Sequence, residues 1–287
     1  MTFSLALLPS PLLDPLAWQP VAQLLAAQGW DVVTFPAGTA APTSQAVLDA
    51  FLDALPIHRE LVLIPHSNAG AYISALTMQR SVVGIVFVDA VLPPKRGRIP
   101  LAPQEFLDYL RGKAHADGML PTWTDWCEEA DVAALFADSS ARVRIEREQP
   151  RLPLSYFEDS LPVPEGWDNR PAAYLAFDDT YSREREEAKR RQWPVITAGA
   201  LGGGLEGSAP RAIGWRLSGE AGVGIRFSHR AGGRGTDLMF NGKRVFSIHS
   251  HQMPSKVLKS NLLRRLPHRP RRDGGVYRNH SPWEKGW

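Results

Sequence analysis

One segment of the chain reads Leu61-Val62-Leu63-Ile64-Pro65-His66-Ser67-Asn68-Ala69-Gly70-Ala71-Tyr72. A run of apolar residues leads into a turn of small residues, and this pattern predicts a buried strand that passes directly into a helix. A tight strand-to-helix turn holds the serine at its centre in a strained conformation and exposes its hydroxyl at the edge of the sheet. Ser67 is therefore the candidate nucleophile, and the backbone N–H of Asn68 is the candidate oxyanion donor.

The same residues also have a purely structural interpretation. Serine, asparagine and glycine are common in turns and at helix N-termini, so Ser67 could simply cap a helix that starts at Asn68. Three features of the chain favour the nucleophile: the apolar run before the serine, the helical pattern after it, and a long insertion further along.

On both sides of this segment, short apolar runs alternate with stretches of helical periodicity. This order predicts an α/β fold with a mostly parallel sheet and helices on both faces. The expected strands are 3–8, 30–35, 61–64, 82–88, 172–177 and 193–196, and the expected helices are 16–28, 44–55, 69–79 and a charged, exposed helix at 182–192.

Residues 92–166 interrupt the alternation and contain helical pieces at 103–112 and 124–136, separated by proline and glycine. We interpret this part as a helical lid insertion over the carboxyl edge of the sheet. Its large apolar side chains are expected either to line the lid above Ser67 or to form a small core of the insertion itself. These side chains are Leu107, Leu110, Trp123 and Trp126.

Over about residues 1–204 the chain resembles the α/β-hydrolase family. The resemblance rests on the elbow at Ser67, on the strand end Val86-Phe87-Val88-Asp89-Ala90, and on the late strand Ala173-Tyr174-Leu175-Ala176-Phe177-Asp178-Asp179. It implies a serine nucleophile, an acid after a late strand, a histidine after the last strand, and a second oxyanion N–H after the first strand. The family's elbow is G-x-S-x-G, and here Pro65 and Ala69 replace the two glycines.

The resemblance gives candidates for the acid and for the second oxyanion donor. Asp178 is the predicted acid and Asp89 the alternative, although each is also the kind of residue that turns and helix caps use. In the loop after the first strand the prolines have no N–H, which leaves Ser10, Leu12 and Leu13 as donors. We take Leu12.

The catalytic base is the gap in the pattern. Residues 200–206, which follow the last expected strand, contain no histidine. His249 is the candidate base and His251 the alternative, and they reach the site only if the apolar run 245–248 docks against the sheet. The competing interpretation is a pair of exposed loop histidines. His66 is expected to point away from the reaction, and the spacing of the later pair does not predict a metal site.

Residues 205–287 form a divergent, basic segment rich in glycine and arginine, and we predict that it is poorly ordered. It has 16 Lys+Arg and 5 Asp+Glu, a balance of +11, whereas the preceding residues have 17 and 25, a balance of −8, within a chain of net charge +3. Such a change is also what a replaced or out-of-frame sequence shows. A nucleic-acid partner is conceivable only through this segment, which contains no known nucleic-acid motif.

The bulk composition restricts the class of protein. The chain has 287 residues, of which 44% are hydrophobic, enough for one α/β core. Its single cysteine excludes an intramolecular disulfide. No segment reaches the ~18 consecutive apolar residues of a membrane helix. We therefore predict a cytoplasmic protein without membrane association, and the sequence does not indicate an oligomeric state.

Together these features predict hydrolysis of a small ester, thioester or amide, with weak or absent activity because the base is not identified. The expected partner is a small-molecule substrate with a carbonyl group, and no cofactor or metal is implied. The alternative is a catalytically dead α/β-hydrolase fold that binds a ligand or a partner through the lid.

Overall fold

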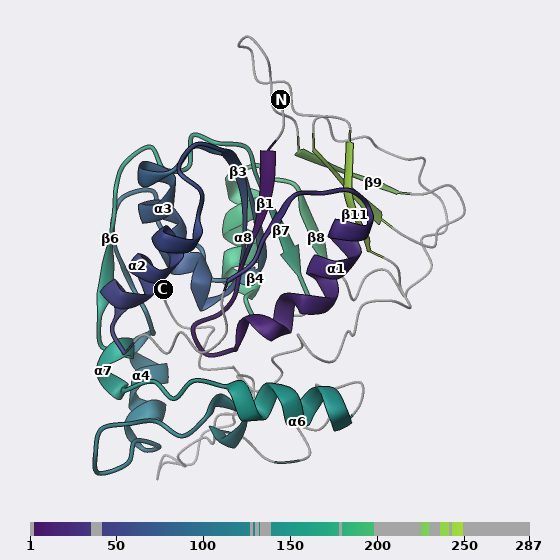
Figure 1. The fold of residues 1–287 in the computed structure, drawn as a ribbon. Helices are drawn as coiled ribbons and strands as arrows, with labels where there is room; N and C mark the ends of the chain where they lie inside the picture. Colours follow the sequence, from purple (N-terminus) through teal and green to yellow (C-terminus); the bar gives the residue numbers. More distant parts are fainter. Residues whose placement is uncertain are drawn as a thin grey trace, which may run out of the picture.

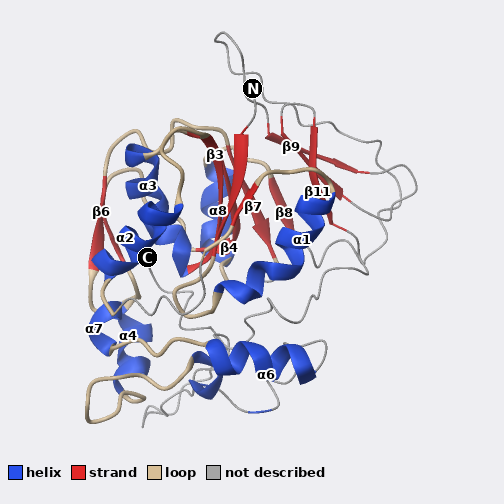
Figure 2. Cartoon of the chain, viewed as in Figure 1, coloured by secondary structure: helices blue, strands red, loops and turns tan. Residues whose placement is uncertain are grey.

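The centre of the protein is a six-stranded sheet with the order β2-β1-β3-β4-β7-β8, and all its pairings are parallel (Figure 1, Figure 2). The structure, a computed structural model, describes residues 3–35, 42–126, 129, 132, 139–177 and 180–197, and the backbone of three further strands within 225–248. Helices cover both faces of the sheet, so the predicted fold class is confirmed.

The strands of the sheet are apolar along most of their length because both faces are covered. In β3, every residue from Leu61 to His66 is buried. The strands are β1 (Phe3–Leu8), β2 (Val32–Val33), β3 (Glu60–Ser67), β4 (Val82–Ala90), β7 (Ala172–Ala176) and β8 (Val195–Thr197).

Alternating side chains of β1 show how the two faces are divided. Leu5 and Leu7 pack with Leu25 of α1, whereas Ala6 and Leu8 belong to the core that contains α2, α3 and α8. In Figure 1, α1 lies in front of the sheet and α8 behind it. None of the described helices is long and apolar enough to span a bilayer. The helical elements are η1 (Pro15–Trp18), α1 (Gln19–Ala27), α2 (Ser44–Ala54), η2 (Asn68–Tyr72), α3 (Ile73–Gln79) and α8 (Ser182–Arg190).

Between β4 and β7 the chain forms a group of short elements, several of which lie beyond one end of the sheet in Figure 1. The first predicted helix of this insertion is confirmed by α4, and the second begins as η3 before the chain leaves the described residues. The elements are β5 (Gly97–Pro100), α4 (Gln104–Arg111), η3 (Trp123–Trp126), α6 (Ser139–Glu148), α7 (Leu154–Phe157) and β6 (Ser160–Val163).

The structure differs from the sequence prediction in the pairing of β5 with β6, which is antiparallel and unpredicted. Pro100 and Pro162 obscure both strands in the sequence. In a two-stranded pair each strand has one free edge, and a proline whose nitrogen faces that edge removes no ladder hydrogen bond.

A second difference concerns α8, which the sequence predicts to be exposed. Glu184 and Ala188 lie one turn apart, and both are buried. The helix therefore packs one narrow stripe against the sheet, and the abundance of charged residues around that stripe hides it in the sequence.

The basic segment 205–287, predicted to be poorly ordered, contains three strands that form a separate antiparallel sheet in the order β11-β10-β9. The apolar run 245–248 lies in the last of them. The strands are β9 (Ile225–His229), β10 (Thr236–Phe240) and β11 (Lys243–Ile248).

Candidate active site

Ser67 ends β3 in a conformation that non-glycine residues rarely adopt. Its φ is 54° and its ψ is −128°, a strained combination that persists only where the surroundings enforce it. The register between β3 and β4 shifts between His66 and Ser67, and the Ser67 carbonyl accepts a hydrogen bond of 3.1 Å from the N–H of Val91. The end of β4 therefore holds the serine backbone in place.

The turn is tight because small residues let two backbones approach. A Cβ on Gly70 would lie 1.9 Å from the carbonyl oxygen of Val91, and the neighbouring Ala69 is fully buried. Pro65, also buried, stands at the first glycine position of the family motif. The elbow thus keeps small residues on the helix side and departs from the motif on the strand side.

The Ser67 hydroxyl has a partner that the sequence did not predict. Its Oγ lies 3.0 Å from the hydroxyl oxygen of Tyr181, at hydrogen-bonding distance. Tyr181 is 8% exposed and directly precedes the first residue of α8. The sequence signal for this residue is its place shortly after a late strand, where the α/β-hydrolase pattern implies an acid.

Asp89, the alternative acid, lies at the same edge of the sheet. It is almost fully buried near the end of β4 and has a φ of 43°. Its Oδ1 accepts a hydrogen bond of 3.2 Å from the N–H of Phe177, so it connects the ends of β4 and β7. Asp178, His249 and His251 lie outside the described residues.

The imidazole of His66 packs into the core of the protein. It is buried edge-on against Trp18, with ring centroids 6.1 Å apart. Burial lowers the pKa of its imidazole to about 4, so the ring is neutral at physiological pH. These contacts identify His66 as part of the core on the α1 side of the sheet.

The loop after β1 uses its backbone donors internally. The N–H of Leu12 donates to Ser10 Oγ at 3.4 Å, and the N–H of Leu13 donates to the Ser10 carbonyl at 2.9 Å. Leu12 as an oxyanion donor remains a prediction. In that role its N–H would exchange the long hydrogen bond to Ser10 Oγ for one to the substrate oxygen.

Asn68 connects the elbow to the insertion. Its Nδ2 donates to the Leu101 carbonyl at 2.9 Å, and its Oδ1 accepts from the Tyr156 hydroxyl at 2.7 Å. The Tyr156 hydroxyl is also 2.9 Å from that of Tyr72. Burial raises the pKa of both phenols, so both stay protonated at physiological pH. This hydroxyl chain (Asn68, Tyr156 and Tyr72) fixes the insertion to the residue that carries the candidate oxyanion N–H.

Removing a hydroxyl from the hydroxyl chain is expected to destabilise the fold. Tyr156→Phe leaves the buried Oδ1 of Asn68 without this donor, and such a loss costs about 1–3 kcal/mol. Tyr72→Phe removes a bond that Tyr156→Phe also removes, so the double variant should lose less than the sum of the two single losses. Urea unfolding of the three variants measures this, and strictly additive losses would contradict a coupled network.

A further buried ionisable group, the carboxyl of Glu184, comes from α8. Burial raises the pKa of the Glu184 carboxyl to about 7. Burial also raises the pKa of the Tyr174 phenol, with further contributions from the charges of Glu184 and Asp89. The Tyr174 hydroxyl donates to the Ala90 carbonyl at 2.7 Å. Ionisable groups from β4, β7 and α8 therefore gather at the same edge as Ser67.

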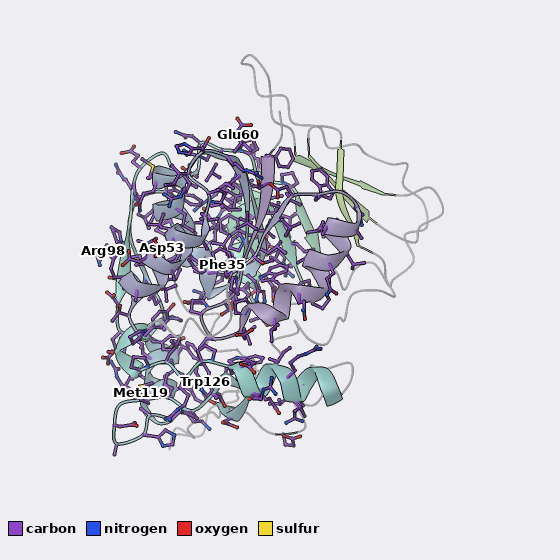
Figure 3. The ribbon with its side chains drawn as sticks, in the orientation of Figure 1. Phe35, Asp53, Glu60, Arg98, Met119 and Trp126 are labelled. Carbon is purple, nitrogen blue, oxygen red and sulfur yellow. The ribbon has the colours of Figure 1, made fainter. Side chains whose placement is uncertain are left out.

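The large side chains of the insertion pack on one another. The ring of Trp126, labelled in Figure 3, lies 5.9 Å from that of Phe106 and 5.9 Å from that of Phe157. Leu107, Leu110 and Trp126 are buried. This packing supports the interpretation that these residues form the core of the insertion.

No protein-family model and no curated protein matches the sequence. Solved structures do match. An extracellular α/β-hydrolase from a Paenibacillus species is 16% identical with a TM-score of 0.53, over 68% of this chain and 89% of that one. Tomato methylketone synthase I with 2-tridecanone is 12% identical with a TM-score of 0.53, over 69% and 89%. The pyrethroid hydrolase PytH is 17% identical with a TM-score of 0.51, over 69% and 88%.

Proposed function

Because the chain has the α/β-hydrolase fold, we propose that it is a hydrolase that attacks a small ester, thioester or amide with Ser67. The observation that carries this proposal is the strained backbone of Ser67, with φ 54° at the carboxyl end of a central strand. A residue that only capped a helix would not need this conformation, and the side chain of Ser67 makes no capping hydrogen bond to η2. One structural neighbour is itself described as a pyrethroid hydrolase, which supports a small-molecule substrate.

The remaining roles follow from the groups around the elbow. Ser67 Oγ attacks the carbonyl carbon, and the Asn68 N–H holds the oxyanion, with the N–H of Leu12 as second donor. We propose Asp178 as the acid, with Asp89 as the alternative that already lies at the sheet edge. His249 and His251 are the imidazoles proposed to receive the proton. Turnover at neutral pH is expected to be low, since serine is a weak nucleophile unless a base activates it.

Labelling by a fluorophosphonate tests the nucleophile directly, because this reagent reports a single attack and needs no turnover. We expect it to modify Ser67 and nothing in Ser67→Ala, as judged by intact mass and peptide mapping. Ser155→Ala is the matched control, since Ser155 is an exposed serine of α7 without backbone strain and its removal should leave labelling unchanged.

Two results would remove the proposal. Labelling that persists in Ser67→Ala would place the reactive group elsewhere. A chain that is folded by circular dichroism but never labelled would leave only the binding function of a dead hydrolase fold.

A further inference from the structure

We propose that Tyr181 is a catalytic residue whose ionised phenol takes the proton from Ser67. The carrying observation is the distance of 3.0 Å between Ser67 Oγ and the Tyr181 hydroxyl oxygen. This inference rests on the proposed function, because it assigns a proton acceptor to that nucleophile. It differs from the histidine expectation, so the two can be separated by experiment.

The geometry is that of a general base. A base must lie within about 2.6–3.2 Å of the atom whose proton it removes, and the Tyr181 oxygen meets this limit before any substrate binds. The two residues are 114 positions apart in the chain. The Tyr181 carbonyl accepts the N–H of Arg185 at 2.9 Å, in the first turn of α8, and the side chain is 8% exposed. The phenol is therefore held by a helix start and by its packing.

The surroundings determine when this base is present. Among the described residues, the ionisable groups that gather at this edge with Tyr181 are Asp89 from β4, Tyr174 from β7 and Glu184 from α8. A free tyrosine phenol ionises near pH 10. Activation of Ser67 is therefore expected at alkaline pH, and low turnover is expected at neutral pH for the same reason.

In each step the Ser67 proton is accepted by the phenolate oxygen of Tyr181 as Oγ forms its new bond. With a fluorophosphonate, the Ser67 proton moves to the phenolate oxygen of Tyr181 while the Oγ–P bond forms, and the P–F bond breaks to release fluoride. With an ester, the proton moves in the same way while the Oγ–C bond forms and the π electron pair of the carbonyl moves to its oxygen, and the carbonyl forms again when the leaving group departs. The phenol then returns the proton to the leaving alkoxide as its bond to the carbonyl carbon breaks, which regenerates the phenolate.

The test is the rate of Ser67 labelling by a fluorophosphonate between about pH 6 and about pH 11, since these limits bracket imidazole and phenol ionisation. We expect the labelling rate of the wild type to rise with pH, and we call this rise the alkaline limb of the pH profile. Tyr181→Phe should lack the limb, so that its labelling rate at the alkaline end is about a hundredfold below that of the wild type. Tyr109→Phe is the matched control. It removes a phenol that donates to the Trp126 carbonyl in the insertion, and it should keep the full limb.

A second variant separates chemistry from structure. Fluorinated tyrosine at position 181 keeps the size and the hydroxyl but ionises at lower pH, so the limb should move to lower pH. A purely structural Tyr181 would leave the limb in place, which would overturn the proposal. A limb near pH 6.5 that disappears in His249→Ala or His251→Ala would identify a histidine base and also overturn it. In both cases Ser67 is still labelled and the proposed function stands. A wild type that is not labelled at any pH would contradict both the proposed function and the role of Tyr181.

Discussion

Gly70→Ala is expected to prevent stable folding, with a loss of at least about 4 kcal/mol, comparable to the whole stability of a small domain. The reason is steric: the new Cβ would lie 1.9 Å from the Val91 carbonyl oxygen, a backbone atom that cannot rotate away. Relief of that contact requires the elbow to separate from the end of β4, and the separation breaks the 3.1 Å hydrogen bond between Val91 N–H and the Ser67 carbonyl.

Soluble yield and urea unfolding measure this effect. Gly112→Ala is the control, because Gly112 ends α4 with an ordinary φ of −72° and its Cβ would come no closer than 3.4 Å to a neighbouring atom. That variant should change the free energy of unfolding by no more than about 1 kcal/mol. Equal stability of the two variants would show that the elbow is not packed as described.

Glu184→Gln is expected to stabilise the protein at alkaline pH and to have little effect in acid. The folded state raises the pKa of this carboxyl from 4.5 to about 7. Between these values the unfolded chain has released the proton and the folded chain retains it, so the wild type loses stability as pH rises through about 7. A shift of this size corresponds to about 3 kcal/mol, and an amide of the same shape removes that loss.

His66 makes the same experiment more informative, because its titration changes the free energy of unfolding with pH in the opposite direction. Its folded pKa is lowered from 6.5 to about 4, so its contribution is complete above pH 6.5 and is lost as pH falls toward 4. In the wild type the two titrations largely offset each other in the interval that they share. Glu184→Gln should therefore reveal a decline in stability below pH 6.5 that the wild type masks.

Urea unfolding at about pH 4, 6 and 8 provides the data, over a range in which both groups titrate. Glu186→Gln is the control, since Glu186 is an exposed residue of the same helix that pairs with Lys189, and such pairs contribute little. If the difference in free energy of unfolding between Glu184→Gln and the wild type is no larger at pH 8 than at pH 4, the carboxyl is not buried in the way described.

The parts of the fold that the sequence predicted are those that depend on neighbouring residues. The run from Leu61 to Ile64 is apolar because β3 has neighbours on both faces, and the small residues after it are needed for the turn itself. Both requirements act within a few residues of Ser67, so they leave a local pattern. The same reasoning recovers β1, β4, β7 and α2 nearly to the residue.

The parts that it missed depend on contacts between distant segments. The partner of Ser67 lies 114 residues away, and Asn68 meets Tyr156 88 residues away. No periodicity records which hydroxyl faces which, and tyrosine is common in cores. Glu184 was missed because a buried carboxyl in a helix of charged residues looks like one more exposed residue. Asp178, His249 and His251 remain predictions for the same reason, since only tertiary contacts assign their roles.

The hydroxyl chain formed by Asn68, Tyr156 and Tyr72 has a consequence for motion. It fastens α7 to the elbow through buried hydrogen bonds, so this helix cannot swing open by loop fluctuation alone. Its opening requires cooperative, sub-global unfolding, and amides near Tyr156 should exchange with solvent far more slowly than those of an ordinary hinged lid. A substrate must therefore reach Ser67 while α7 stays in place, and residues outside α7 must form the entrance to the site.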